Sequence, residues 1–287
     1  MAANRPPAAI ATPRAAAVMC HPVQRRSVFA KLITLNYPSL RSGWLCNAGN
    51  ASNAYDLSMV AGLPSGHSVA DLHLHTTYSD GRAAPVDVLS KAIESGLSVI
   101  AITDHDRIDG AVLAAAAALG TDCEVVVGEE ISSAGGHVAG LFLKSVVPPG
   151  LSVAATIAAI HEQGGLAVAV HPFYRLGGAR GVGPAAAGLA WDAIEVENAS
   201  PVALLANRRA RAAQASWARA ATGGSDAHIL AAVGAAVTTF PGRSAADLRH
   251  ALETGNTNWV RVNRSPALAI RALAWSVQRR ITMGPAA

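Results

Sequence analysis

Residues 69–81 read VADLHLHTTYSDG, an alternating segment followed by a run of small and polar residues. The alternation predicts a β-strand over residues 69–75 that ends in polar side chains. His73 and His75 are two positions apart, so their imidazoles point to the same face of such a strand. One metal ion can bind both rings, but a lone His-x-His pair is weak evidence, because several arise by chance. Support for metal binding has to come from elsewhere in the chain.

Outward from this strand, expected strands alternate with expected helices. Further strands are expected at residues 97–103, 123–127, 137–143, 166–170, 193–197 and 221–225, with another extended piece at 237–240. Helices are expected at residues 85–95, 108–119, 153–163, 201–220, 245–253 and 267–280. Such alternation is typical of parallel βαβ units, and it leaves an α/β barrel or an open wound sheet as the architecture. In both, functional side chains gather where the strands end.

Histidines and acids follow nearly every expected strand. Six of the ten histidines lie at strand edges, beside carboxylates of the same segments: His73, His75, Asp80, His105, Glu129, Glu130, His137, His171, Asp226 and His228. Imidazole and carboxylate ligands without thiolate are typical of Zn²⁺, Mn²⁺ or Fe sites. Burying so many ionisable groups without a cation is costly, and carboxylates can bridge two ions. The sequence therefore predicts two or three divalent metal ions per chain.

The ordered motifs resemble the PHP (polymerase and histidinol phosphatase) family of metal-dependent phosphoesterases. They are DLHLHTTYSDG at 71–81, AITDHD at 101–106, GEEIS at 128–132, HPF at 171–173 and GSDAH at 224–228, and the resemblance covers about residues 68–257. It implies a distorted (β/α)7 TIM-like barrel with a trinuclear metal centre. Only 34 positions separate His137 from His171, so the chain looks like the short form of the family, which has no inserted subdomain there.

The resemblance also implies a set of site residues. One metal would be held by His73, His75, Glu130 and Asp226; a second by Glu130, His137 and His171; a third by Asp80, His105 and His228. The resemblance gives Asp80, His105 and His228 a catalytic role as well.

Some neighbouring residues leave alternatives open. Glu129 and Glu130 point opposite ways on a strand, and the family pattern favours the acid directly before the Ile-Ser pair, which is Glu130. Arg175 follows the HPF motif and is a catalytic candidate that could bind a phosphate bidentately, with a surface salt bridge as an equal alternative. Asp104 and Asp106 flank His105 and are expected to orient it rather than to bind metal.

Composition divides the chain into three segments. Residues 1–55 contain six basic residues and no acid; since the whole chain carries +4, the remainder carries −2. We expect residues 1–65 to form a disordered N-terminal extension, with a targeting peptide as the alternative. Residues 66–262 would form the catalytic domain and residues 263–287 a basic amphipathic helix. The mildly acidic body gives no general signal for nucleic acid.

Cysteine content and hydropathy bear on location. The three cysteines show no metal-binding or redox spacing, which favours a reducing compartment, and we expect the cytoplasm. No apolar run approaches the length of a membrane-spanning helix, so no membrane partner is expected. The sequence leaves the oligomeric state open.

Three functions fit these observations. The first is hydrolysis of a phosphomonoester, a nucleotide or similar small phosphate, by metal-activated water. The second is a 5′–3′ exonuclease acting on short DNA or RNA oligonucleotides, favoured by the arginines of helix 201–220 and by the basic C-terminal helix. The third is a non-catalytic metal-binding module, which has no physical need for nine ligand-type residues.

Overall fold

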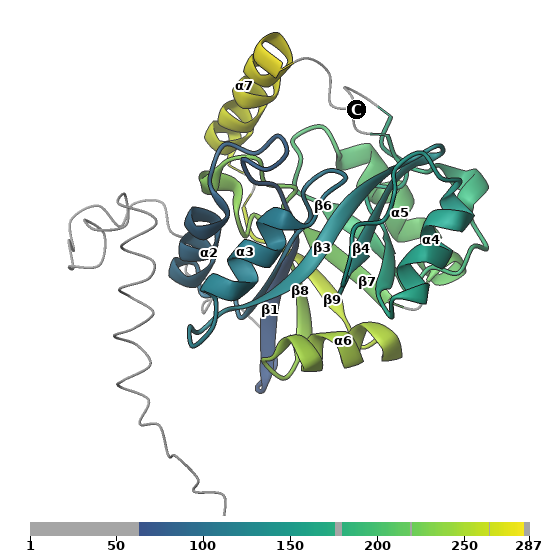
Figure 1. Cartoon of the computed structure of the whole chain (residues 1–287), viewed down its shortest axis with the longest axis horizontal. Coiled ribbons are helices and arrows are strands. Elements are labelled where there is room, and N and C mark those ends of the chain that lie inside the picture. Colours follow the sequence, from purple (N-terminus) through teal and green to yellow (C-terminus); the bar gives the residue numbers. More distant parts are fainter. Residues whose placement is uncertain (1–62, 176–179, 219, 264, 284–287) are drawn as a thin grey trace, which may run out of the picture. The chain divides into compact units, whose positions relative to one another are not determined.

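The computed structural model describes residues 63–175, 180–218, 220–263 and 265–283. The expected N-terminal extension, residues 1–65, lies almost entirely outside these ranges. Within them, strands and helices alternate and the strands form one curved sheet (Figure 1).

The sheet contains nine strands in the order β7-β6-β5-β4-β3-β2-β1-β8-β9. β1 pairs in parallel with β2, β2 with β3, β5 with β6, and β6 with β7. The strands are β1 (His67–Leu74), β2 (Val99–Ile102), β3 (Glu124–Ser133), β4 (Gly136–Leu141), β5 (Leu166–Ala169), β6 (Ala193–Asn198), β7 (Ala220–Gly224), β8 (Ala236–Pro241) and β9 (Asn258–Arg261).

The sheet curls until β7 approaches β8, which makes it a nearly closed barrel. The Thr238 hydroxyl accepts a hydrogen bond from the Gly223 N–H at 3.0 Å and donates one to the Gly223 carbonyl at 2.9 Å. A Cβ at Gly223 would lie 2.7 Å from the Val237 carbonyl oxygen, so a side chain there would push the two strands apart. The expectation of a distorted α/β barrel is confirmed.

Strand number and direction differ from a (β/α)7 pattern. β4 is antiparallel to both β3 and β5, because β3 and β4 form a hairpin joined at Ala134–Gly135 rather than a βαβ unit. β8 and β9 are also antiparallel to their neighbours. Among the described residues the sheet therefore has nine strands instead of seven, and β9 has no counterpart in the sequence-based expectation.

Helices cover the sheet as the sequence indicates, and their ends follow local signals. Pro85 begins α2, the Ser152 hydroxyl caps α4, and α6 starts with a capping box and ends at Gly255, whose φ of 75° a glycine adopts without strain. The helices are α2 (Pro85–Glu94), α3 (Asp109–Ala117), α4 (Val153–Glu162), α5 (Leu204–Trp217), α6 (Ala245–Thr254) and α7 (Pro266–Met283), with short 3₁₀ turns η3 (Pro184–Ala186) and η4 (Leu230–Ala232).

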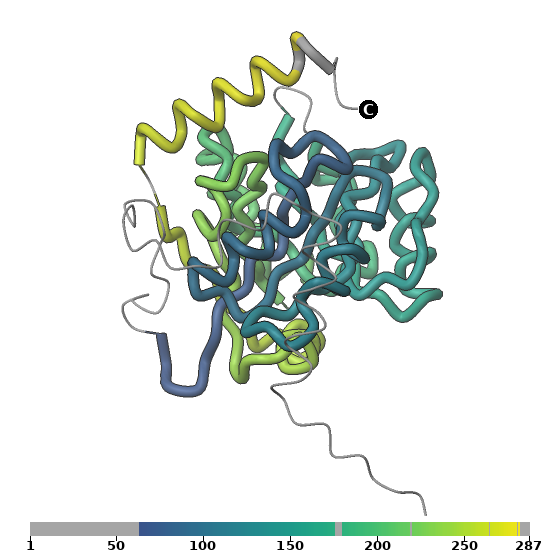
Figure 2. Tube along the Cα trace, turned by 60° about the vertical axis from the view of Figure 1, so that its left-hand side comes forward, coloured from purple at the N-terminus to yellow at the C-terminus, as the bar shows by residue number. Residues whose placement is uncertain are grey.

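The two ends of the barrel differ. α6 lies at the amino ends of the parallel strands, where the Ala245 N–H donates to the Glu124 carboxylate at 2.9 Å; Leu248 and Leu252 join a core cluster with strand residues there (Figure 1). α7 lies toward the opposite end, apart from the sheet in both views (Figure 2). The carboxyl ends of the parallel strands are therefore left for functional groups. Within the described ranges, none of the helices combines the length and apolar character that crossing a bilayer requires.

Candidate metal centre

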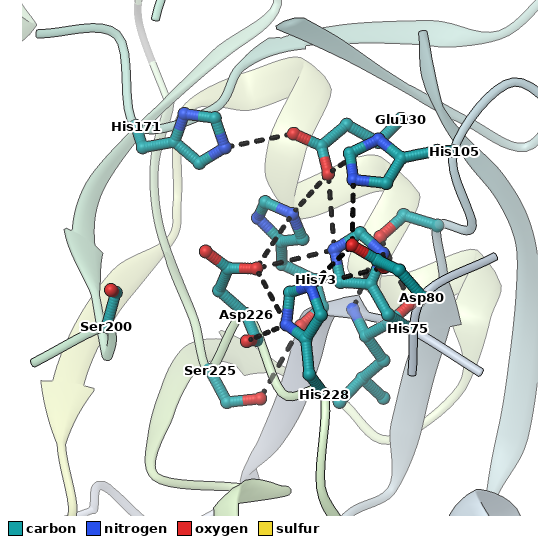
Figure 3. Close-up of polar contacts among 12 residues, drawn as sticks. His73, His75, Asp80, His105, Glu130, His171, Ser200, Ser225, Asp226 and His228 are labelled. Atoms are coloured by element: carbon teal, nitrogen blue, oxygen red, sulfur yellow. Dashed lines mark hydrogen bonds and ion pairs between the residues drawn. The ribbon is translucent and has the colours of Figure 1, made fainter. Parts of the chain in front are cut away.

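The nine residues predicted to bind metal come together at the carboxyl ends of the parallel strands, although they are spread over residues 73–228 of the chain. Figure 3 labels all of them except His137. Six are buried: His73, His75, Asp80, Glu130, His137 and His171. The other three, His105, Asp226 and His228, are partly buried. The cluster is thus largely buried and consists of residue types that bind metals.

Glu130 lies at the centre of the cluster. Its Oε1 is 2.7 Å from His137 Nδ1 and 2.9 Å from His171 Nε2, and its Oε2 is 3.1 Å from His73 Nε2 and 3.2 Å from His75 Nε2. A single carboxylate thus lies close to four imidazoles from three segments of the chain. This arrangement is what a bridging ligand between two ions requires.

Glu129 points to the other side of β3. Its carboxylate accepts a hydrogen bond from the Val147 N–H at 2.8 Å, away from the histidines. Burial raises the pKa of Glu129 to about 7. The alternation of side chains along a strand separates the two adjacent acids, and Glu130 is the one brought into the cluster.

Asp226 and Asp80 complete the carboxylate set. Asp226 Oδ1 lies 3.3 Å from His75 Nε2 and 3.6 Å from His73 Nε2. Asp80 lies on the other side of His75, 3.4 Å from its Nδ1 and 3.2 Å from His228 Nε2. Three acids are therefore interleaved with six imidazoles.

Four overlapping groups of donor atoms can each hold a divalent ion, since the atoms of each lie within 4.8 Å of one another. They are His73, His75 and Glu130; His73, His171 and Asp226; His105, Glu130 and His137; and His75, Asp80, His105 and His228. One of these groups contains the three residues predicted for the third metal together with His75. Another joins Glu130 and His137 with His105, whereas the prediction for the second metal joins them with His171, whose ring lies 2.9 Å from Glu130.

Several imidazole nitrogens of the cluster have no hydrogen-bond partner among the described residues, and a bound cation would supply the missing interaction. Both ring nitrogens of His75 and the Nδ1 of His105 are buried and make no hydrogen bond to the described residues, although carboxylate oxygens lie nearby. A buried polar atom without a partner is costly, and a cation between an imidazole and a carboxylate would satisfy both.

The pKa values of the cluster reflect its crowding. Burial opposes ionisation of Glu130, but His105, His137 and His73 hold the pKa of its carboxyl well below the ordinary value. Burial likewise opposes a charge on His73, yet the carboxylates of Asp226 and Glu130 raise its pKa well above 6.5.

The pKa values of the two more exposed imidazoles, His105 and His228, are lowered, in contrast to that of His73. Burial lowers the pKa of His105 to about 3 and that of His228 to about 4, and the neighbouring His75 ring lowers both. The rings at the opening are therefore neutral near pH 7, the form that binds a metal.

Backbone conformation at the strand ends aims two of these side chains. His171 has φ of 30° and Asp226 has φ of 53°, in the left-handed region that residues with side chains rarely adopt. Each lies two residues after the end of a strand, His171 after β5 and Asp226 after β7. Such conformations cost free energy and persist where the surrounding structure holds them, often at functional sites.

Glu195 is a residue of the site that sequence reasoning did not single out. It is buried, its Oε1 lies 3.1 Å from His73 Nδ1, and its Oε2 accepts hydrogen bonds from the His171 N–H at 2.8 Å and the Asn198 amide at 3.0 Å. The signal was present, because Glu195 and Glu197 alternate with apolar residues on an expected strand. An acid behind a metal-binding imidazole fixes the orientation of the ring.

Asp104 and Asp106 brace loops. Asp104 accepts hydrogen bonds from the Thr76 N–H at 2.7 Å and the Ser79 hydroxyl at 2.6 Å. Asp106 accepts from the Ser132 N–H at 2.7 Å. Neither is bonded to the His105 ring within the part of the chain that the structure describes, so their support reaches the site through the backbone.

Arg175 is exposed, and no contact among the described residues joins it to the nine. A Cβ added at Gly183 would lie 2.5 Å from one of its guanidinium nitrogens, so the side chain lies along that glycine. The structure does not bring this catalytic candidate to the centre.

Comparison with known proteins agrees with this geometry. The PHP domain model matches residues 71–208, and the PHP-associated model matches residues 205–257. The chain is 40% identical over 141 residues to the uncharacterized protein MJ1587 of Methanocaldococcus jannaschii, across 45% of this chain and 81% of that protein.

Shorter matches link the chain to two enzymes. It is 34% identical over 97 residues to a 5′-3′ exoribonuclease of Haemophilus influenzae, across 32% of this chain and 35% of that enzyme. It is also 34% identical over 96 residues to a 3′,5′-nucleoside bisphosphate phosphatase of Chromobacterium violaceum, across 32% of this chain and 33% of that enzyme.

The fold has a solved counterpart. A two-domain protein from Bacteroides vulgatus that contains a predicted PHP-like metal-dependent phosphoesterase superposes with a TM-score of 0.55, at 19% identity over 74% of this chain and 70% of that chain. Fold, motif order and matched length lead to one conclusion: the chain belongs to the PHP family of metal-dependent phosphoesterases.

Proposed function

We propose that this protein hydrolyses a small phosphomonoester, a nucleotide or a similar phosphate, at the cluster around Glu130. The observation that carries the proposal is the buried Glu130 carboxylate within 3.2 Å of four imidazoles from three chain segments. A cluster of this size gathers two or three divalent ions, and Mn²⁺, Zn²⁺ or Fe suits its donors.

The nine residues divide into three groups, one for each proposed ion. His73, His75, Glu130 and Asp226 would hold one ion; Glu130, His137 and His171 a second; Asp80, His105 and His228 a third. When bound, divalent ions supply Lewis acidity, lowering the pKa of water and neutralising charge on phosphoryl oxygens.

The chain's own groups position this chemistry. Glu195 holds the His73 ring through Nδ1, which leaves Nε2 directed at Glu130 and Asp226. The His228 and His105 side chains are 23% and 16% exposed and are the most accessible of the nine, and Asp80 lies 3.2 Å from the His228 ring. We assign Asp80, His105 and His228 the contact with the reacting phosphoryl group. Arg175 is retained as a second candidate for contact with the phosphate.

A 5′–3′ exonuclease acting on short oligonucleotides is the second candidate, and the Haemophilus influenzae relative favours it. The arginines of α5 give it less support than the sequence suggested. Arg211 pairs with the Glu197 carboxylate and lies 4.5 Å over the Trp259 ring, so it faces the protein. Arg208 and Arg209 are exposed and remain available for phosphates.

The experiment is a Mn²⁺-supplemented hydrolysis screen of the full chain. It compares 5′-mononucleotides, nucleoside 3′,5′-bisphosphates and sugar phosphates with 5′-phosphorylated DNA and RNA oligonucleotides. We expect release of inorganic phosphate from a monoester to exceed release of mononucleotides from an oligonucleotide. The reverse order would favour the exonuclease.

The control variants separate catalysis from folding. His73→Ala with His75→Ala removes two imidazoles from the centre and should abolish hydrolysis. His161→Ala with His250→Ala removes two imidazoles outside it and should leave hydrolysis intact; His161 lies 2.8 Å from Asp192 and His250 is exposed. A metal-loaded wild type that hydrolyses no phosphoester would contradict the proposal and favour a non-catalytic metal-binding module.

A further inference from the structure

The C-terminal helix α7 is docked on the loop that carries Asp80. The Trp275 indole N–H donates to the Asp80 carbonyl at 3.2 Å, and the Arg82 guanidinium lies 5.6 Å from the centre of the Trp275 ring. Leu268 and Ala272 pack with Trp275 against the core cluster that includes residues of α2 and η4. These contacts fix one side of α7 beside the loop that carries Asp80.

Arg279 lies one helical turn beyond Trp275 and therefore on the same side of α7. Its guanidinium forms an ion pair with the Asp80 carboxylate, and its side chain is only 11% exposed. A permanently charged group from outside the matched PHP models, which end at residue 257, is thus placed at the donor group of His75, Asp80, His105 and His228.

Two cations that lie close together attract an anion. A divalent ion bound at that donor group would bind the Asp80 carboxylate and would therefore lie close to the Arg279 guanidinium. A phosphoryl group satisfies both, because its oxygens bind a divalent ion and also match the planar donors of a guanidinium. The exposed candidate, Arg175, has no comparable contact.

From this placement we infer that Arg279 binds the phosphoryl group of the substrate, so that α7 supplies a specificity residue to the barrel. The inference rests on the proposed function only in that the site accepts a phosphoryl group. In this role Arg279 contacts the phosphoryl anion and not the metal ions. Removing it should therefore weaken phosphate binding without weakening Mn²⁺ binding.

The test is isothermal titration of the Mn²⁺-loaded full chain with inorganic phosphate, paired with Mn²⁺ titration of the metal-free chain. Losing two charge-assisted hydrogen bonds should weaken phosphate binding in Arg279→Ala by about 10-fold or more. Arg279→Lys keeps the charge without the planar donors and should recover only part of the affinity. Mn²⁺ should bind Arg279→Ala as tightly as wild type or more tightly, because a cation competing for Asp80 is gone.

Arg271→Ala is the matched control, because it removes the same charge from an exposed position of the same helix. It should bind phosphate like the wild type. Phosphate affinity of Arg279→Ala within about twofold of wild type would overturn the inference. The inference would also be overturned if Arg279→Ala bound Mn²⁺ more weakly by an amount that explains the whole loss of phosphate affinity. Arg279 would then act by positioning the Asp80 carboxylate and not by binding phosphate. Phosphate can bind without being released from a substrate. If Arg279→Ala loses phosphate affinity but the wild type hydrolyses no phosphoester, the inference about Arg279 stands and only the proposed function is wrong.

Discussion

Glu130 and Glu129 are adjacent, yet substituting them should have different effects on metal affinity. Glu130→Gln removes a charge that lies among four imidazoles, and we expect Mn²⁺ affinity to fall at least about 100-fold, the upper end of what outer partners of a metal ligand cost. Glu129→Gln keeps an oxygen for the Val147 N–H, and Mn²⁺ affinity should not change. Metal content after dialysis measures both. Equal metal loss in the two variants would contradict the assignment.

Glu195 should act through the His73 ring. Glu195→Gln weakens the acceptor behind Nδ1, and we expect Mn²⁺ affinity to fall about 10- to 100-fold, with the fold intact by circular dichroism. Glu197→Gln is a suitable comparison on the same strand, because Glu197 pairs with Arg211 and Arg261 instead. An unchanged metal affinity in Glu195→Gln would show that the ring is held by other contacts.

At the level of single residues, the sequence predicted the site where histidines and acids recur at the ends of the expected strands. The nine histidines and acids could be predicted to converge because parallel strands bring their carboxyl ends together. Arg279 could not be predicted, because its position depends on how α7 docks on the Asp80 loop. Arg175 shows the converse: proximity to a motif in sequence did not place the side chain at the centre.

At the level of elements, α6 offers a pH test that is independent of the metal centre. Asp247 accepts hydrogen bonds from the Arg243 and Ser244 N–H groups and from the Ser244 hydroxyl, and these lower the pKa of its carboxyl to about 2. A lowered folded pKa gives stability that is present above the ordinary value of 3.8 and is lost as pH falls toward 2.

The measurement compares wild type and Asp247→Asn by thermal unfolding across this pH window. The difference between their melting temperatures should shrink as the pH falls, because the wild-type carboxylate becomes protonated. A difference that stays constant would mean that the capping box contributes no charge-dependent stability. The metal centre titrates equally in both proteins and cancels in the comparison.

Helices were more predictable than strand direction. Pro85, Gly164 and Gly255 mark helix boundaries by local chemistry, and the expected helices fall within a few residues of the observed ones. β4 was expected as one more strand, but apolar periodicity carries no information on direction, and the short turn at Ala134–Gly135 produces a hairpin. β9 was missed because its four residues are only partly buried and show no clear alternation.

At the level of the whole molecule, closure of the barrel and binding of metal are coupled. The sheet brings together the carboxyl ends of β1, β2, β3, β5 and β7 and the amino end of β4, and with them three acids and six imidazoles. Burial opposes a charge on His73, His75 and His137, but the neighbouring carboxylates raise the pKa values of all three rings. Ions that bind only the folded chain should therefore stabilise it.

Metal removal should consequently lower the melting temperature, and the effect should grow with pH. A single Mn²⁺ site at 100 times its dissociation constant stabilises the fold by about 2.7 kcal/mol. His73 has a pKa well above 6.5 and must lose a proton before it binds a metal, so raising the pH from about 6 to about 8 favours the ion. Thermal unfolding with Mn²⁺ or with EDTA at several pH values measures this. The shift should be smaller in the variant with His73→Ala and His75→Ala, which loses one of the three proposed sites. A shift that shrinks with rising pH would mean that these imidazoles are not ligands.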